Sequence, residues 1–253
     1  MCRLSTRDRQ KSKQASDPER DMFLAMVSHE LRTPSNAILG WAQLIKDKHV
    51  DEKTIAHGIE VIERNAKLQA RLIEQLLEFS RVNNGLLRLD AGRASLAPIL
   101  EAAVDTMLPQ AQAKEIDLHL ELDASAIAVT CDPARLHQVI TNLLANAIKF
   151  TPSGGRVGIR LADRGSYAEI TVSDTGQGIP TEFLPHIFDP FRQAGAGKAT
   201  LRDGLGLGLT IARHIIERHR GKIYAESLGE GTGTKFTVTL PLEEETASIK
   251  LQA

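Results

Sequence analysis

The chain of 253 residues is 42% hydrophobic and 25% charged, and 31 basic residues against 32 acidic ones leave a formal charge of −1. This balance gives no indication of a nucleic-acid groove or of binding to an anionic membrane surface, and the length allows one or two domains. With two cysteines and no apolar stretch long enough to cross a membrane, we expect a soluble, cytoplasmic chain with no disulfide framework and no membrane contact.

The first part of the sequence predicts two helices joined by a turn. Ser16-Asp17-Pro18-Glu19 is typical of a helix start, or of a weak point in a longer helix that enters from an upstream domain. Apolar residues then recur at three- and four-residue steps over 23–45, with a kink expected near Pro34, and again over 55–79. A lone helical hairpin cannot cover both apolar stripes, so we predict a homodimer that forms a four-helix bundle.

Asn83-Asn84-Gly85 ends the second helix, and beyond it short β-branched runs alternate with helical patterns. We predict strands at Leu86–Leu89, Ile116–Leu122, Ile127–Thr130, Gly155–Ala162, Tyr167–Asp174, Lys222–Ser227 and Thr234–Leu240. We predict helices at Leu96–Ala113, Pro133–Phe150 and Gly208–His219. Several strands follow one another without a crossover helix, which favours an α/β sandwich with a largely antiparallel or mixed sheet over a Rossmann fold. Residues 195–204 lack periodicity and predict a mobile loop.

Two glycine clusters are candidates for phosphate binding. Asp174-Thr175-Gly176-Gln177-Gly178 follows a predicted strand, and Gly204-Leu205-Gly206-Leu207-Gly208 precedes a predicted helix. Glycines let backbone N–H groups approach phosphate oxygens, and a helix N-terminus favours negative charge. Neither cluster is a Walker A loop or a Rossmann fingerprint, and each taken alone is more often an ordinary turn.

Two further patterns carry polar side chains on helices. Asn142, Asn146 and Lys149 share one helical face, which is suited to a hydrated Mg²⁺ ion and a triphosphate or is simply a solvated face. His29 lies in Ser28-His29-Glu30-Leu31-Arg32-Thr33-Pro34, off the apolar stripe and hence accessible. An exposed histidine is usually inert, and no second histidine completes a zinc-protease motif.

Together these motifs resemble the sensor histidine kinase family, from about Asp21 to Leu242. The matching segments are the histidine box at 28–34, the asparagine box at 142–151, the first glycine box at 174–178, Phe188-Asp189-Pro190-Phe191, the second glycine box at 204–208, and Gly231-Thr232-Gly233-Thr234. The resemblance implies a multidomain α and α+β fold, in which a dimerising helical hairpin precedes a Bergerat-type ATP-binding α/β sandwich. It implies a linker or signalling helix at 1–20, the phosphotransfer hairpin at 21–84, the ATP-binding domain at 85–242 and a polar tail at 243–253.

The resemblance also implies how ATP and Mg²⁺ are held. Asn146 would coordinate Mg²⁺, with Asn142 and Lys149 beside it, and Asp174 would accept a hydrogen bond from the adenine amino group. Gly176 and Gly178 would leave room for the nucleotide, and Gly204, Gly206 and Gly208 would hinge and floor the lid over the phosphates. Phe188 and Phe191 would help position that lid, Arg192 would steady the γ-phosphate, and Thr234 lies in the last motif.

For the hairpin, the resemblance implies that His29 accepts the γ-phosphoryl group and that Glu30 polarises its imidazole. The phosphoryl group would then pass to a response-regulator receiver domain, selected on the face that carries Arg32, Asn36 and Gly40. Thr33 would orient water for dephosphorylation of that regulator, or would merely end the helical hydrogen bonding before Pro34. A longer parent would add an upstream sensor domain.

One departure and two rival functions remain. Ser35 stands where the family usually has an apolar residue, so its hydroxyl needs a partner, such as a carbonyl freed near Pro34. One rival is a gyrase-like or heat-shock-90-like ATPase, in which a glutamate replaces Asn142 as the base that activates water. The other is a dimerisation scaffold that binds nucleotide without catalysis.

Overall fold

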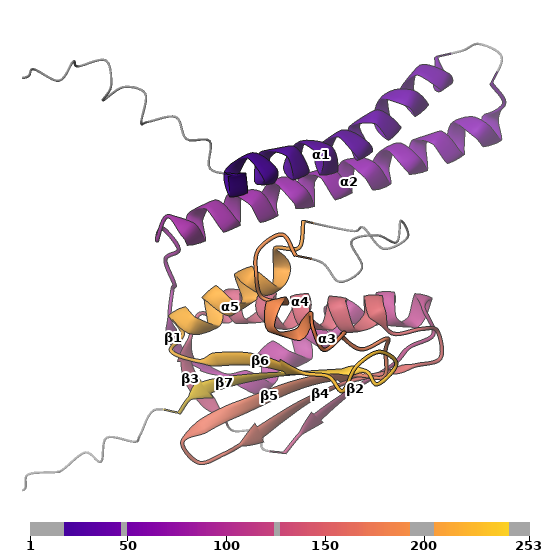
Figure 1. Cartoon of the computed structure of the whole chain (residues 1–253). Helices are drawn as coiled ribbons and strands as arrows, with labels where there is room; N and C mark the ends of the chain where they lie inside the picture. Colours follow the sequence, from indigo (N-terminus) through magenta and orange to yellow (C-terminus); the bar gives the residue numbers. More distant parts are fainter. Residues whose placement is uncertain (1–17, 47–49, 124–126, 193–204, 243–253) are drawn as a thin grey trace, which may run out of the picture. The chain divides into compact units, whose positions relative to one another are not determined.

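We describe the protein from a computed structural model, which covers residues 18–46, 50–123, 127–192 and 205–242 (Figure 1). The described residues form two compact units: the first runs to Leu76 and also includes Leu205, and the second begins at Leu77. The boundary falls inside a helix, so the last two turns of that helix belong with the second unit. The predicted helix start at Ser16-Asp17 lies outside the described residues.

The first unit is a helical hairpin. Helix α1 spans Pro18–Ile45 and continues through Pro34, and α2 spans Glu52–Asn83. Asp51 caps α2, because its carboxylate accepts hydrogen bonds from the N–H and the hydroxyl of Thr54 at 2.8 and 3.1 Å. The helices approach closely at Gly58, where a Cβ atom would lie 2.6 Å from the Trp41 ring. This part of the predicted fold is confirmed.

Helix α2 ends as its sequence predicts. Gly85 has φ +67°, and the N–H groups of Gly85 and Leu86 bond to the carbonyls of Val82 and Arg81 at 3.0 and 2.8 Å. This is a Schellman motif, which needs a residue in the left-handed region after the helix. Glycine supplies that conformation without steric cost.

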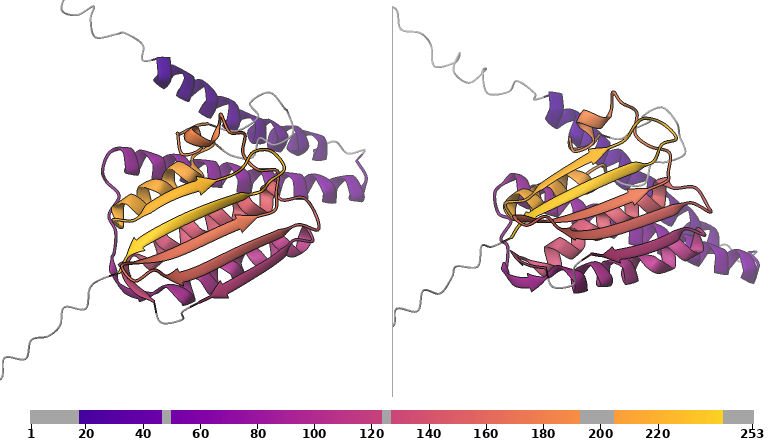
Figure 2. Two further views of the ribbon diagram at one scale, coloured as in Figure 1. Left: turned by 60° about the horizontal axis from the view of Figure 1, so that its bottom comes forward. Right: turned by 90° about the horizontal axis from the view of Figure 1, so that it is seen from below.

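The second unit is an α/β sandwich built on a five-stranded mixed sheet in the order β2-β4-β5-β7-β6 (Figure 1). The strands are β2 (Asp117–Leu122), β4 (Arg156–Asp163), β5 (Tyr167–Asp174), β6 (Lys222–Glu226) and β7 (Thr234–Pro241). Only the β2–β4 pair is parallel. Helices α3 (Leu96–Ala113), α4 (Pro133–Phe150) and α5 (Gly208–Arg218) lie on one face of this sheet (Figure 2). The predicted α/β sandwich with a mixed sheet is confirmed.

The core lies between the sheet and the three helices. The fully buried side chains that fill it come from α3, α4 and the inner face of the sheet, and include Leu96, Leu100, Leu136, Ile140, Leu143, Leu144, Ile148, Ile159, Leu161 and Ile170. These residues follow the helical period of about 3.6 on α4 and the period of 2 on β4 and β5. Aliphatic packing therefore holds the sandwich together, as the low aromatic content predicts.

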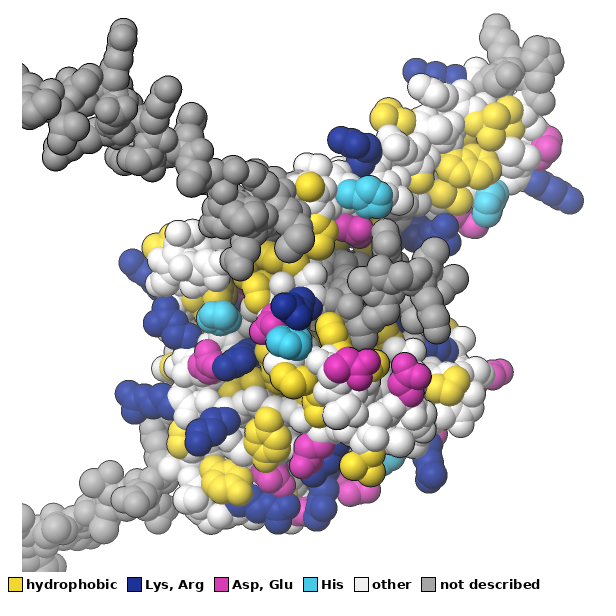
Figure 3. Space-filling model, in the orientation of Figure 1, with side chains coloured by type: hydrophobic (Ala, Val, Ile, Leu, Met, Phe, Trp, Pro, Cys, Tyr) yellow, Lys and Arg dark blue, Asp and Glu magenta, His cyan; other side chains and the backbone are white. Residues whose placement is uncertain are grey.

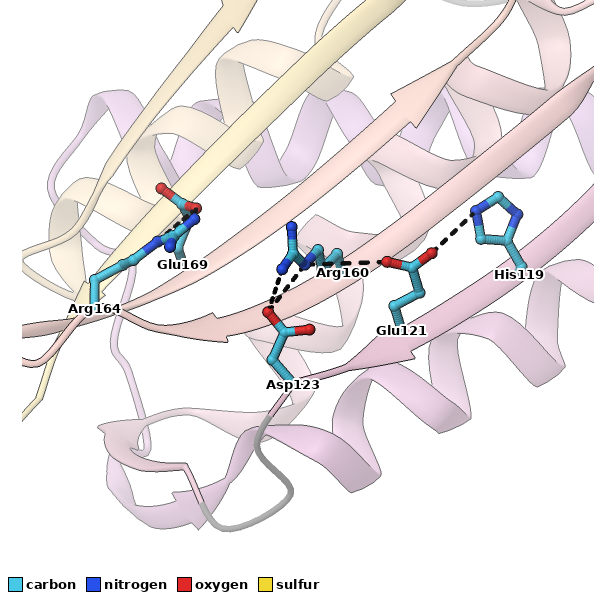
Figure 4. A network of polar contacts seen from close by, with 6 residues as sticks. All are labelled: His119, Glu121, Asp123, Arg160, Arg164 and Glu169. Carbon is cyan, nitrogen blue, oxygen red and sulfur yellow. Dashed lines mark hydrogen bonds and ion pairs between the residues drawn. The ribbon is translucent and has the colours of Figure 1, made fainter.

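The outer face of the sheet is polar, and its basic and acidic side chains form ion pairs with one another (Figure 4). Arg160 on β4 binds Asp123 through Nε and Nη2 at 3.0 and 2.5 Å, with Glu121 4.0 Å away, and Arg164 binds Glu169. Each exposed pair stabilises the fold little. Across the surface in view, basic and acidic side chains lie interspersed (Figure 3).

One predicted strand is wrong: Leu86–Leu89 is irregular, and the strand lies instead at β1 (Gly92–Ser95), paired with β3 (Ala128–Cys131). Side chains, rather than a neighbouring strand, bind the backbone of Leu87 and of the flanking residues Gly85 and Asp90. Arg218 donates to the carbonyls of Gly85 and Leu87 at 3.2 and 2.9 Å, and the Asp90 N–H donates to Asp132 at 2.9 Å. These long-range partners were not visible in the local pattern of apolar residues.

Asp132 and His219 join the start of α4 to the end of α5. Asp132 caps α4 by accepting from the Arg135 N–H at 3.1 Å, and its own N–H donates to Nε2 of buried His219 at 2.9 Å. Since Nδ1 of His219 lies 2.7 Å from the Ile215 carbonyl, which can only accept, the imidazole is neutral with its proton on Nδ1. Burial alone would raise the pKa of Asp132, but the N–H groups of Asp90, Arg135 and Ala134 lower it overall.

None of the helices in the described part of the chain combines the length and the apolar character needed to cross a bilayer.

We predict that Asp132→Ala lowers the free energy of unfolding by about 2–4 kcal/mol, the sum of a lost helix cap and an unsatisfied Asp90 N–H. Because the folded-state pKa of Asp132 is lowered, its contribution is present at neutral pH and is lost as the pH falls through that lowered pKa. Urea unfolding at neutral and acidic pH measures this. Asp105→Ala, at an exposed position on α3, is the control and should have little effect. An equal effect of the two variants would contradict the prediction.

Candidate functional site

The end of β5 places a carboxylate in a partly buried position. Asp174 accepts hydrogen bonds through Oδ1 from the N–H groups of Gly176 at 2.8 Å and Thr234 at 3.2 Å. Burial raises the pKa of Asp174, and the two N–H groups oppose the rise without cancelling it. The Oδ2 atom accepts from no described residue, which leaves an acceptor at the end of the strand for a ligand donor.

The glycines after Asp174 are required by the chain's own packing. A Cβ atom on Gly176 would lie 2.5 Å from the Phe150 carbonyl oxygen and 2.8 Å from Oδ1 of Asp174. Gly178 has φ +69°, and a Cβ there would meet the Gly229 carbonyl at 2.1 Å. A side chain at Gly176 would therefore clash with Asp174 and Phe150, and one at Gly178 would clash with the backbone at Gly229.

The third glycine motif joins the first through a contact that the sequence pattern does not reveal. The Gly233 N–H bonds to the Gly176 carbonyl at 3.1 Å, and the Ser227 hydroxyl donates to the Gly233 carbonyl at 2.8 Å. Ser227 also accepts from the Ile179 N–H at 3.0 Å. Sequence reasoning missed Ser227, since its only signal is its place at the end of a predicted strand. Thr234, which it included, is nearly buried and contacts Asp174 through its backbone.

Helix α4 carries the asparagines on the face opposite its buried leucines. Asn142, Asn146 and Lys149 are each half-buried, and the Lys149 ammonium lies 5.3 Å from the Phe150 ring centroid. Gly208, the first residue of α5, would bring a Cβ within 4.0 Å of the Asn142 amide. The asparagine helix and the second glycine box therefore meet at the N-terminus of α5, where backbone N–H groups favour anions.

The Phe box holds one unusual backbone conformation. Phe191 has φ +65°, a genuine outlier for a bulky residue, and a Cβ on Gly206 would lie 2.9 Å from the Arg192 carbonyl oxygen. Arg192 and Gly206 thus lie against each other in the fold. The predicted site residue Gly204 and the predicted mobile loop at 195–204 lie outside the described residues.

Arg192 and Phe188 have partners of their own. The Arg192 guanidinium lies 3.5 Å from the Asp189 carboxylate, which also contacts His186 at 2.8 Å. The Phe188 carbonyl accepts from the Thr210 hydroxyl at 2.9 Å, and its ring packs edge-on against Phe236, with 6.4 Å between the centroids. Arg192 would therefore have to share or leave Asp189 in order to contact a phosphate.

In the first unit, His29 is open to solvent and paired with its neighbour. Its side chain is 64% exposed, and Nδ1 lies 3.5 Å from Oε1 of Glu30, whose side chain is 18% exposed. A carboxylate on Nδ1 leaves Nε2 as the exposed nucleophilic nitrogen. The Thr33 hydroxyl donates to the His29 carbonyl at 3.2 Å, which is the bond to the carbonyl four residues earlier that a threonine inside a helix commonly makes.

The hydroxyl of Ser35 is hydrogen bonded, as its half-buried position requires. Its hydroxyl donates to the Leu31 carbonyl at 2.8 Å and accepts from the Gln69 amide at 3.3 Å. The carbonyl that Pro34 deprives of its helical donor is that of Glu30, so the Ser35 bond is to a different carbonyl from the one expected.

Comparisons with known proteins find matches to both the helical hairpin and the sandwich. A family model of the His Kinase A (phospho-acceptor) domain matches residues 19–85, and one of the histidine kinase-, DNA gyrase B- and HSP90-like ATPases matches residues 131–244. The sensor histidine kinase RcsC of Escherichia coli strain K12 is 37% identical over 234 residues, covering 92% of this chain. The chain belongs to the sensor histidine kinases of two-component systems.

Two solved structures resemble this histidine kinase chain. ThkA, in complex with the response regulator protein TrrA, is 26% identical with a TM-score of 0.69 over 95% of this chain and 68% of that one. Full-length ShkA, in complex with AMPPNP, is 27% identical with a TM-score of 0.66 over 87% of this chain and 45% of that one. The chain spans 24% of the length of RcsC.

The residues present fit a nucleotide that brings its own magnesium. No cluster of three or more His, Cys, Asp or Glu side chains suited to a metal occurs among the described residues. The half-buried asparagines of α4 offer amide oxygens instead. Mg²⁺ typically takes only one or two protein ligands, with phosphate oxygens and water supplying the rest.

We predict that Asp174→Asn separates nucleotide binding from stability. The amide oxygen can still accept from Gly176 and Thr234, but loss of a charged acceptor should weaken ATP binding by about 1.5–3 kcal/mol, or roughly 10- to 100-fold. Because burial raises the pKa of Asp174, the charged form costs stability as the pH rises through that pKa. The variant without nucleotide should therefore be as stable as the wild type, or more so, at neutral pH. Calorimetric ATP titration and urea unfolding measure both; a destabilised variant with unchanged ATP affinity would contradict the assignment.

Proposed function

We propose that the chain is the catalytic core of a protein-histidine kinase, which transfers the γ-phosphoryl group of ATP to His29 and then to an aspartate of a response regulator. The main observation that supports this proposal is the pairing of exposed His29 with Glu30 at Nδ1, in a chain that also matches the ATPase family model. In the first step Nε2 of His29 bonds to the γ-phosphorus while the bond to the bridging oxygen breaks and ADP leaves. Glu30 holds the proton on Nδ1 and stabilises the imidazolium that forms.

We assign the nucleotide contacts to the second unit. Asp174 selects the adenine amino group, and Asn146, with Asn142 and Lys149 beside it, holds Mg²⁺ and the phosphates. When bound, Mg²⁺ neutralises charge on the phosphates. The remaining contacts are Gly176 and Gly178 beside the nucleotide, Gly204, Gly206 and Gly208 in the lid, Phe188 and Phe191 at its base, Arg192 toward the γ-phosphate, and Thr234 behind Asp174.

The proposed domains are the linker at 1–20, the phosphotransfer hairpin at 21–84, the ATP-binding domain at 85–242 and the tail at 243–253. A homodimer is supported by the hairpin's exposed apolar side chains, among them Leu39 at 59% and Ile59 at 54%, and by the phospho-acceptor family match. A response-regulator partner is supported by the ThkA complex with TrrA. We propose a cytoplasmic site of action, where ATP is available, and an upstream sensor domain in a longer parent protein.

The identity of residue 142 disfavours the ATPase rival. Asn142 stands where such enzymes carry the glutamate that activates water, and an amide cannot act as a general base. A dimerisation scaffold would need no exposed histidine with a carboxylate on Nδ1. Acid-labile, base-stable phosphate on the protein after incubation with ATP distinguishes the kinase from both rivals.

We predict that His29→Ala abolishes acid-labile protein phosphate while ATP affinity stays unchanged, because the nucleotide contacts lie on the sandwich. Radiolabelled autophosphorylation and ATP titration of the two proteins measure this. Retained acid-labile phosphate in the variant would refute the assignment of His29.

A second activity is proposed for Thr33. Its exposed hydroxyl lies one helical turn from His29 and can rotate away from the His29 carbonyl to orient a water molecule toward the regulator's acyl phosphate. We predict that Thr33→Ala slows regulator dephosphorylation on the order of tenfold or more, since positioning of the water is lost, while autophosphorylation persists. Parallel assays of the two activities test this. Equal loss of both would favour a purely structural role for Thr33, and unchanged dephosphorylation would remove Thr33 from the mechanism.

A further inference from the structure

The C-terminal end of α4, which carries Asn146 and Lys149, is capped by a lysine from another part of the sandwich. Lys114 directly follows α3, and its ammonium lies 2.7 Å from the carbonyl oxygen of Ile148 and 2.7 Å from that of Lys149. An ammonium donates up to three hydrogen bonds, and here two of them go to one helix end. We call this arrangement the Lys114 cap. All of its residues belong to the second compact unit.

Each of the last four carbonyls of α4 has a donor from outside the helical pattern. An α-helix leaves these carbonyls without the N–H group that a further turn would supply. The Ala147 carbonyl accepts from the N–H and the hydroxyl of Thr151 at 3.0 and 2.7 Å, and the Phe150 carbonyl accepts from the Gln177 N–H at 3.1 Å. The remaining two carbonyls are those of the Lys114 cap.

The residue that follows the helix explains why a side chain has to supply this donor. If α4 continued, the Ile148 carbonyl would accept from the N–H of residue 152, but that residue is Pro152, which has no N–H. The Lys114 charge also balances the partial negative charge that peptide dipoles place at a helix C-terminus. Lys114 forms no ion pair with a carboxylate of the described residues, so its charge acts on the helix end.

The turn that carries Lys114 is itself held in place. Glu115 has φ +58°, its carbonyl accepts from the Gly154 N–H at 3.1 Å, and its carboxylate accepts from the Ser153 hydroxyl at 2.6 Å. A residue other than glycine keeps such a conformation only where its surroundings enforce it. The Lys114 N–H bonds to the Ala111 carbonyl at 3.1 Å. The turn after α3 is therefore bound to the turn after α4, and the ammonium is held beside the carbonyls that it caps.

The capped turn supports the candidate site in two ways. In the helical pattern the Phe150 N–H donates to the carbonyl of Asn146, the residue assigned to Mg²⁺. The Phe150 carbonyl accepts from Gln177 in the first glycine box, and a Cβ on Gly176 would lie 2.5 Å from the same oxygen. Fraying of the last turn of α4 would therefore release the backbone of Asn146 and the seat of the glycine box.

We propose that Lys114 is a positioning residue for nucleotide binding: by capping the end of α4, it holds Asn146 and Lys149 in the directions that Mg²⁺ and the phosphates of ATP require. Lys114 has no assigned contact with the nucleotide and acts through the helix end. This inference deepens the nucleotide assignment and rests on the proposed kinase function.

The test compares the Mg-ATP affinity of Lys114→Met with that of the wild type, by calorimetric titration at a temperature where urea unfolding shows both to be folded. Methionine keeps an unbranched apolar stem but has neither the charge nor the N–H donors. We expect Mg-ATP to bind about tenfold more weakly, which is the scale of one lost charge-assisted hydrogen bond. Adenosine has no phosphates to engage Asn146 or Lys149, so its affinity should stay near that of the wild type.

Two matched variants separate positioning from a general loss of charge or folding. Lys114→Arg keeps a cation with N–H donors, so its Mg-ATP affinity should stay within about threefold of the wild type. Lys222→Met removes the same charge from an exposed position on β6 that has no ion pair with a described carboxylate, and should bind both ligands as the wild type does. Amide hydrogen exchange gives a readout without ligand: the Gln177 N–H should exchange faster in Lys114→Met and not in Lys222→Met.

Three outcomes would overturn the proposal: an unchanged Mg-ATP affinity in Lys114→Met, an equal loss of Mg-ATP and adenosine affinity in that variant, or an equal loss in Lys114→Arg and Lys114→Met. The failure of the proposed function looks different. A wild-type chain that bound no Mg-ATP, or that formed no acid-labile phosphate, would count against the kinase itself. A wild type that binds Mg-ATP, beside a Lys114→Met variant that binds it equally well, would exclude the role of the Lys114 cap alone.

Discussion

The division of α4 into two faces is the constraint on which the rest of the second unit depends. One face carries Leu136, Ile140, Leu143 and other fully buried side chains that hold the helix on the sheet. The opposite face presents polar side chains from Arg135 to Lys149. Because the buried face locks the rotation of the helix, the asparagines and Arg135 are held in fixed directions without further supporting elements. Core packing and the candidate site are therefore two consequences of one amphipathic pattern.

Two energetically unfavourable features lie at the candidate site. Asp174 is a carboxyl whose pKa is raised by burial, and Phe191 adopts a left-handed backbone that bulky residues avoid. Such features persist only where the surrounding fold enforces them, and they are typical of binding sites. Gly176 and Gly178 are constrained in the same way. A Cβ atom on them would lie 2.5 Å from the Phe150 carbonyl oxygen and 2.1 Å from the Gly229 carbonyl oxygen, so no other residue fits at either position.

Much of this fold was predictable because its signals are local. The bounds of α3, α4 and β5 follow directly from hydrophobic period and turn chemistry, and Gly85 ends α2 as expected. The strand predicted at Leu86–Leu89 failed because Arg218 binds the Leu87 carbonyl and Asp132 binds the N–H of Asp90 just after the segment, and both partners are distant in sequence. Ser227 was missed for the same reason: a serine at a strand end carries no signal of the two loops it joins. The roles assigned to the site residues remain predictions.

By itself the sequence determined which segments are helices and strands and which residues are able to carry the chemistry, because periodicity, capping and glycine spacing act over a few residues. Only the tertiary structure decided which of these residues meet. Thr234 reaches Asp174, 60 positions away, through the register of β5 with β7, and Glu78 reaches Arg135, 57 positions away, through the packing of α2 on α4. Such contacts depend on the relative placement of whole elements, which the burial of apolar faces fixes and no local pattern encodes.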